Sequence, residues 1–120
     1  MAEHNEFGKE AEKYAESYLK EKGYGIVAKN WFFNKAEIDI IAKFQNQIII
    51  VEVKALHSDG LTNPEDAVNS KKRKLLIMAA DEYIQQNNIV LEARFDIISM
   101  VKTGTKWKIS HLEDAYNSVN

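Results

Sequence analysis

Residues 36–55, AEIDIIAKFQNQIIIVEVKA, decide the fold of this chain. Two apolar runs, rich in β-branched isoleucine and valine, flank the polar pair Gln45-Asn46, and this pattern is typical of a β-hairpin. We therefore expect one strand over Glu37 to Phe44 and a second over Gln47 to Ala55. Both runs are apolar enough to be buried, yet each carries charged residues that a buried hairpin does not need.

Charged residues inside the two strands include Glu37, Asp39, Glu52 and Lys54. A turn of two or four residues places Asp39 opposite Glu52 and Glu37 opposite Lys54, whereas a three-residue loop or a bulge shifts the pairing by one residue. Like charges directly opposite each other destabilise a sheet. The Asp39–Glu52 pair therefore predicts a compensating group, and hard divalent cations such as Mg²⁺ or Mn²⁺ bind carboxylate oxygens.

Lys54 follows Glu52 on the same face of its strand and adds a cation to the two carboxylates. A lysine there can contact a phosphate oxygen, orient the attacking water or stabilise charge in the transition state. These residues indicate metal-assisted hydrolysis of a phosphodiester. The other interpretation is a solvated face with a weak Glu37–Lys54 ion pair. The apolar neighbours of Asp39 and Glu52 favour the catalytic interpretation, because a solvated strand shows more polar alternation.

The spacing of apolar residues predicts the elements on either side of the hairpin. In chain order they are a helix over Glu3 to Lys22, an extended segment over Tyr24 to Phe33, a loop over His57 to Asn63, a helix that opens near Pro64 and carries an apolar stripe to Ile84, strands over Leu91 to Val101 and Lys106 to Leu112, and a short helix over Glu113 to Ser118. The order α-β-β-β-α-β, followed by a β-α tail, predicts an α/β fold in which helices flank a mixed sheet.

Length and composition limit the possible functions. The 120 residues, 45% of them hydrophobic, fit a single domain over residues 1–120. The net charge of -2 predicts that any nucleic-acid site is local, and the lack of cysteine excludes disulfides and thiolate metal sites. The longest strongly apolar run, Ile48 to Val51, is far shorter than the roughly 20 residues that span a bilayer. We expect a cytoplasmic protein with no membrane partner.

Asp39, a spacer and then Glu52-Val53-Lys54 resemble the PD-(D/E)XK nuclease motif. In more detail, the chain resembles the YraN-like uncharacterised bacterial family, which has the restriction-endonuclease-like fold. The motifs that carry this resemblance extend over nearly the whole chain: Gly8-Lys9-Glu10, Ala15, Tyr18-Leu19, Gly23-Tyr24, Asn30-Trp31, Glu37-Ile38-Asp39, Val51-Glu52-Val53-Lys54, Arg94-Phe95-Asp96, His111-Leu112 and Ala115-Tyr116.

The resemblance implies a Mg²⁺- or Mn²⁺-dependent nuclease acting on DNA, with branched or recombination and repair intermediates among its candidate substrates. Asp39 and Glu52 would then be metal ligands, the Val53 carbonyl would complete the shell and Lys54 would be the catalytic lysine. Glu37 would support this site. Glu10 would join it from the first helix, as in nucleases resembling archaeal Holliday-junction resolvases, although an ordinary exposed glutamate explains Glu10 equally well.

Two questions of function stay open at this point. A protein of this fold can also be a non-catalytic nucleic-acid or protein-binding module, because a fold does not fix a function. The sequence also does not say whether two copies must pair to cut both strands, so a homodimer is one candidate arrangement.

One dense basic run, Lys71-Lys72-Arg73-Lys74, falls near the start of the second long helix, where the helix dipole disfavours cations. Contact with DNA phosphates would account for it, and so would a solvated helix face. Arg94 and Asp96 share one face of a strand and are expected to be structural. The histidines show no spacing typical of a zinc site or a catalytic dyad. The adjacent aromatic residues 31–33 are either divided between core and surface or stack on bases.

Overall fold

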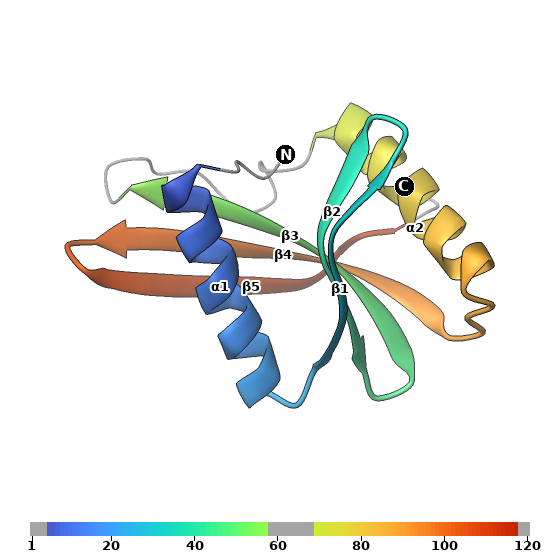
Figure 1. Ribbon diagram of the computed structural model, residues 1–120, viewed down its shortest axis with the longest axis horizontal. Coiled ribbons are helices and arrows are strands. Elements are labelled where there is room, and N and C mark those ends of the chain that lie inside the picture. Colours follow the sequence, from blue (N-terminus) through green and yellow to red (C-terminus); the bar gives the residue numbers. More distant parts are fainter. Residues whose placement is uncertain (1–4, 58–68, 118–120) are drawn as a thin grey trace.

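The computed structural model describes residues 5–57 and 69–117 (Figure 1). In chain order these form helix α1 (Glu6–Glu21), strands β1 (Gly25–Phe33), β2 (Ala36–Phe44) and β3 (Gln47–His57), helix α2 (Ser70–Gln86), and strands β4 (Glu92–Thr103) and β5 (Lys106–Tyr116). The predicted α-β-β-β-α-β core is confirmed.

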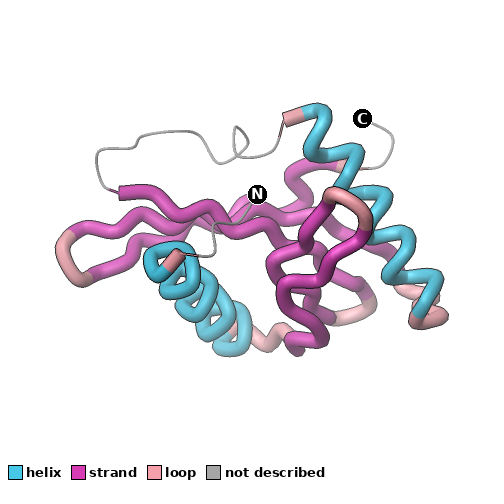
Figure 2. The backbone as a smooth tube through the Cα atoms, turned by 45° about the horizontal axis from the view of Figure 1, so that its top comes forward, coloured by secondary structure: helices cyan, strands magenta, loops and turns pink. Residues whose placement is uncertain are grey.

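The strands form one mixed sheet in the order β1-β2-β3-β4-β5. Figure 2 shows the strands in magenta and the two helices in cyan. Only β3 and β4 run parallel, and the other neighbours are antiparallel. The apolar residues of α2 pack on one face of the sheet with Ile48 and Ile50 of β3, while those of α1 pack on the other face with Ile49, Val51 and Val53. Burial on both faces explains why β3 is an almost continuous apolar run.

Helix α1 lies close to the sheet because its buried face consists mainly of small side chains. Gly8, Ala11, Ala15 and Leu19 are its buried residues. The side chain of Asn5 accepts a hydrogen bond of 2.8 Å from the Gly8 backbone N–H and so caps the helix. The predicted helix is thus confirmed over its described residues.

Helix α2 begins at Ser70, where the side chain of Asn69 accepts a hydrogen bond of 2.9 Å from the Lys72 backbone N–H. Pro64, expected to open this helix, and the predicted loop beyond His57 lie outside the described residues, and His57 itself ends β3. Neither helix in the described part of the chain combines the length and the apolar character needed to cross a membrane.

The short helix predicted at the C-terminus is wrong for its described residues. Residues 113–116 continue β5, with Asp114 at a φ of 52° and an irregular register opposite Phe95 to Ile97. The Asp114 backbone N–H donates to Asp96 Oδ1 at 3.0 Å, and the Tyr116 ring packs on Phe95. These contacts with β4 hold the segment as a bulged strand.

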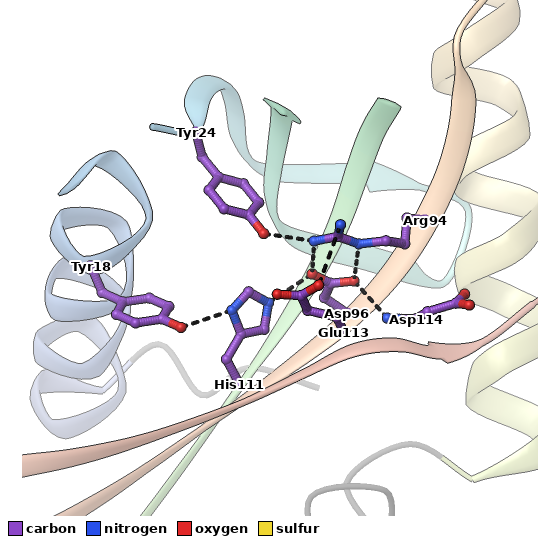
Figure 3. Close-up of polar contacts among 7 residues, drawn as sticks. All are labelled: Tyr18, Tyr24, Arg94, Asp96, His111, Glu113 and Asp114. Atoms are coloured by element: carbon purple, nitrogen blue, oxygen red, sulfur yellow. Dashed lines mark hydrogen bonds and ion pairs between the residues drawn. The ribbon is translucent and has the colours of Figure 1, made fainter. Parts of the chain in front are cut away.

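A buried carboxylate, Asp96, is the centre of a polar network between α1, β4 and β5 (Figure 3). Arg94 donates to it from Nε at 2.9 Å and from Nη2 at 2.7 Å, and a hydrogen bond of 2.7 Å joins it to His111 Nε2. Burial alone would raise the pKa of Asp96, but the hydrogen bonds from His111 and Arg94 hold that pKa below its usual range. Asp96 therefore remains charged in the interior.

Two tyrosines connect this network to the end of α1 (Figure 3). Tyr18 Oη lies 3.0 Å from His111 Nδ1, and Arg94 Nη2 donates to Tyr24 Oη at 2.6 Å. The spacing of the histidines in the sequence did not predict this His111–Asp96 pair, because the pairing of β4 with β5 creates it. The contacts match the structural role expected for Arg94 and Asp96.

Replacing Asp96 with asparagine should lower the free energy of unfolding by about 3–5 kcal/mol, because the buried Arg94 guanidinium loses its counterion. The matched control is Glu113→Gln, since Glu113 also faces Arg94, at 3.6 Å, but its side chain is 60% exposed. That change should lower the free energy of unfolding by less than about 1 kcal/mol. Urea unfolding measures both, and similar losses in the two variants would contradict the assignment.

Candidate active site

The site begins where strands β2 and β3 separate. Their pairing places Ile41 opposite Ile50, as predicted, and Phe44 opposite Gln47 across the two-residue turn. The predicted register is confirmed from Phe44 and Gln47 as far as Ile40 and Val51, where the pairing ends. The predicted pairs Asp39–Glu52 and Glu37–Lys54 lie beyond this point and are not part of the ladder, so these residues meet only through their side chains.

Asp39 is the most deeply buried acid of the hairpin, with none of its surface exposed. Its Oδ2 atom accepts a hydrogen bond of 2.7 Å from the Val53 backbone N–H and thereby replaces the β2 carbonyl that a regular ladder would supply. Its Oδ1 atom is buried and receives no hydrogen bond from the described residues. One oxygen of Asp39 therefore fixes the side chain, and the other is available for a cation or a proton.

Glu52 lies beside Asp39 and is only 2% exposed. The charge of Glu52 acts on Asp39, so the two carboxyl groups interact directly. Glu52 Oε2 also forms an ion pair with Nζ of Lys72, which comes from the first turn of α2 and is itself largely buried. The second helix thus supplies a counterion to the acidic pair.

Burial dominates the electrostatics of this group. Burial, and then the charge of Glu52, raise the pKa of Asp39 well above its usual range. Burial raises the pKa of Glu52 to about 8 and lowers the pKa of Lys72 to about 8. Contact between the ammonium and the carboxylate opposes both shifts, because each charged group is the other's counterion. Both acids therefore bind protons more tightly in this site than in water.

Glu37 and Glu12 surround this pair on the side of α1. Asn30 Nδ2 donates to Glu12 Oε1 at 3.2 Å and to Glu37 Oε2 at 3.1 Å, so that one amide joins helix α1, β1 and β2. The charges of both glutamates raise the pKa of Glu52. Glu37 thus lies at the site, as predicted.

Glu12 is a site residue that the sequence interpretation missed. It lies four residues after Gly8 and three before Ala15, within the stripe of small buried residues on α1. A charged residue inside such a stripe must lie against the sheet. The position of Glu12 within this stripe is the signal in the sequence that could have identified it as a site residue.

Glu10, predicted from the resemblance to join the site, is held elsewhere by other contacts. Its carboxylate accepts hydrogen bonds from Lys102 Nζ at 2.9 and 3.2 Å and from Trp107 Nε1 at 3.2 Å. These partners lie near the turn that joins β4 and β5. The structure therefore brings Glu12 of α1, and not Glu10, to the acidic pair.

The lysine of the motif, Lys54, is half-buried two residues beyond Glu52 on β3, next to Ser99 of β4. Its charge lowers the pKa of Glu52, so the two groups interact. Among the described residues, no group of three or more acidic or histidine side chains is arranged to hold a metal ion. The protein would therefore offer a cation two carboxylates, Asp39 and Glu52, and the neighbouring Val53 carbonyl.

The four basic side chains at the start of α2 point to different surroundings. Lys72 points inward to Glu52, and the Arg73 guanidinium lies over the Tyr116 ring at 5.5 Å. Lys71 and Lys74 are exposed. The four side chains therefore do not form one continuous basic surface.

Comparison with known proteins identifies the family. A sequence model of the Uncharacterised protein family UPF0102 matches residues 11–100, a range that includes the acidic pair and Lys54. The chain belongs to the UPF0102 family. The YraN-like resemblance drawn from its motifs is thereby confirmed.

UPF0102 proteins of similar length share much of this sequence. One from Phocaeicola vulgatus is 46% identical over 116 residues, which cover 97% of this chain and 96% of the relative. One from Flavobacterium psychrophilum is 47% identical over 116 residues, covering 97% and 98%, and one from Parabacteroides distasonis is 43% identical, covering 97% and 96%. These names state no reaction, so the chemistry of this UPF0102 protein must be argued from its site.

The raised pKa of Glu52 should make stability depend on pH. Because the folded chain binds this proton more tightly than the unfolded chain, the free energy of unfolding in chelator should fall as the pH rises from 5 to 8. The fall should be at least about 1.4 kcal/mol, the equivalent of one pKa unit. Urea unfolding at several pH values measures it.

The variant Glu52→Gln should make this fall shallower, because Asp39 is then the only acid of the pair with a raised pKa. Asp81→Asn, at an exposed position of α2, is the control and should keep the slope of the parent protein. The assignment would be contradicted by a slope in Glu52→Gln as steep as that of the parent.

Proposed function

We propose that this protein is a Mg²⁺- or Mn²⁺-dependent nuclease that hydrolyses phosphodiester bonds in DNA. The observation that carries the proposal is the buried Asp39–Glu52 pair, in which Asp39 Oδ1 receives no hydrogen bond from the described residues. Two carboxyl groups held together away from water are strongly destabilising unless a cation or a proton neutralises them. Active sites are a common reason for keeping such an arrangement.

The donor set fits a small hard cation. Mg²⁺ and Mn²⁺ prefer oxygen ligands and are commonly held by one or two carboxylates, with water and phosphate oxygens completing the shell. Asp39, Glu52 and the Val53 carbonyl are the groups that would hold the ion. When bound, such an ion lowers the pKa of a coordinated water and stabilises negative charge on the phosphoryl group.

Lys54, Lys72 and Asn30 would set the charge of the site and the positions of its acidic side chains. Lys54 carries a positive charge next to Glu52, where an ammonium group can orient a water or bind a phosphate oxygen. Lys72 supplies a counterion to Glu52 from α2, so one acid of the pair is paired before any ligand arrives. Asn30 fixes Glu12 and Glu37 relative to each other and sets the acidic wall on the side of α1.

One contact favours a second candidate function, a non-catalytic nucleic-acid or protein-binding module. Lys72 pairs directly with Glu52, and an internal counterion of this kind makes the fold stable without a metal ion. The nuclease and the binding module differ in what they require of a metal ion. Only the nuclease requires a metal ion bound by Asp39 and Glu52.

Added Mn²⁺ should raise the melting temperature of the parent protein, because a ligand that binds only the folded state stabilises it. At a hundredfold excess over Kd the gain is about 2.7 kcal/mol, or roughly 10 °C for a domain of this size. Asp39→Asn and Glu52→Gln should lose most of this shift. Thermal scans in chelator and in millimolar Mn²⁺ measure it, with Glu113→Gln as a surface control that responds like the parent.

Cleavage of a panel of labelled branched and linear DNA in Mn²⁺ tests the reaction itself. The parent and Glu113→Gln should cut at least one member of the panel, while Asp39→Asn and Glu52→Gln should be inactive. A metal response that depends on Asp39 and Glu52 without cleavage would favour the binding module. An equal response to metal in all four proteins would place the ion elsewhere and remove the basis of the nuclease proposal.

A further inference from the structure

A groove of about 630 Å³ lies between α1 and β1, beside the acidic pair. Its charged lining is mixed: α1 contributes Glu6, Lys9, Glu10, Glu12, Lys13 and Glu16, and β1 contributes Lys29 and Asn30. Figure 1 shows α1 and β1, the two elements that supply these residues. A groove of this size admits an extended chain of a ligand.

The groove leads directly to the candidate active site. Two of its lining residues, Glu12 and Asn30, are hydrogen-bonded to each other, and Asn30 is also hydrogen-bonded to Glu37. The charges of Glu12 and Glu37 in turn act on Glu52. A ligand lying in the groove would therefore contact Glu12 and Asn30, which adjoin the acidic pair.

The free positive charges of the groove come from α1. Lys9 and Lys13 are exposed, lie one helical turn apart and form no ion pair with any residue in the described part of the chain. Lys29 is paired with Glu16 at 3.0 Å, and Glu10 is neutralised by Lys102. Two unpaired ammonium groups on one helix face offer contacts for an anionic backbone.

An exposed aromatic ring, that of Phe32, lies on the same face of the β1–β2 hairpin as Glu37. Phe32 is 63% exposed and is the direct cross-strand partner of Glu37, so the two side chains share one face of the hairpin. The rings on either side, Trp31 and Phe33, belong to the opposite face and pack with the core under α2. Phe32 therefore presents an exposed aromatic face beside Glu37 on which a flat ligand group can stack.

We infer that this groove binds an unpaired DNA strand, with a base stacked on Phe32 and the phosphate backbone on Lys9 and Lys13. The inference deepens the proposed function, on which it rests, by naming the substrate class as DNA with single-stranded segments. A base inside a duplex has both faces covered by its neighbours, whereas an unpaired base can stack on an exposed ring. The ring therefore selects unpaired over paired DNA.

The basic run of α2 is the rival surface for the strand. Two of its four side chains are engaged within the protein, Lys72 with Glu52 and Arg73 with the ring of Tyr116. Lys71 and Lys74 remain exposed there and provide a matched pair of lysines on the other helix.

Fluorescence anisotropy with a labelled single-stranded oligonucleotide, and with the duplex of the same sequence, tests the inference in chelator, where cleavage cannot occur. Phe32→Ala should weaken single-strand binding roughly fivefold or more and leave duplex binding unchanged. Val27→Ala, an exposed apolar position on the same strand, is the control and should change neither. All these positions are exposed, so thermal scans should show parent-like folding.

The double variant Lys9→Ala with Lys13→Ala should reduce the slope of log K against log salt by about 1.4 for the single strand, since each lost phosphate contact contributes about 0.7. Lys71→Ala with Lys74→Ala should leave the slope unchanged. Parent-like single-strand binding in Phe32→Ala, or a slope that falls only in the α2 variant, would overturn the inference.

The outcome can be separated from that of the proposed function. If the groove variants behave as expected but no DNA is cleaved in Mn²⁺, the strand site stands and the nuclease proposal fails. If Asp39 and Glu52 prove necessary for cleavage while Phe32→Ala and the Lys9 and Lys13 variant bind like the parent, the nuclease proposal stands and the groove inference fails.

Discussion

The interaction on which this structure depends is the close approach of two buried acids, Asp39 and Glu52. Each would be charged in water, and neither can stay charged in the interior without a partner. The contacts around them supply those partners: the Val53 N–H to Asp39 and the Lys72 ammonium to Glu52. In the proposed function, a metal ion with a phosphate would meet both signs of charge in this site.

Each helix supplies one element of this environment. Helix α2 places Lys72 in its first turn, a position that the helix dipole disfavours for a cation, and the buried Glu52 offsets that effect. Helix α1 lies close to the sheet through glycine and alanine, which leaves room for Glu12 to reach Asn30. The same small side chains thus serve packing and site geometry together.

Much of the fold could be predicted from the sequence, because hydrophobic periodicity and the two-residue turn encode it locally. The register of Ile41 with Ile50 followed from counting outward from Gln45-Asn46. The pattern could not show that β2 and β3 separate beyond Ile40, since the divergence arises from packing of the whole sheet. The sequence pattern therefore predicted that Asp39 and Glu52 face each other on a regular ladder. In the structure they lie beyond the ladder and only their side chains meet.

The errors and omissions share a cause: each depends on residues distant in the sequence. Glu12 could be distinguished from Glu10 only by knowing which face of α1 meets the sheet, and Trp107 and Lys102 hold Glu10 from another element. The strand at residues 113–116 looked helical because its stabilising partner, Asp96, lies in β4.

The irregular backbone of β1 has a further consequence, for association between molecules. Among the described residues β1 is an outer strand, with a neighbouring strand on one side only, and a flat strand in that position is a template for edge-to-edge pairing. A register shift between Ile26 and Ala28 and the left-handed conformation of Asn30, at a φ of 49°, interrupt this edge. The backbone irregularity that directs the Asn30 side chain to Glu12 and Glu37 therefore also disfavours edge-to-edge pairing of two sheets.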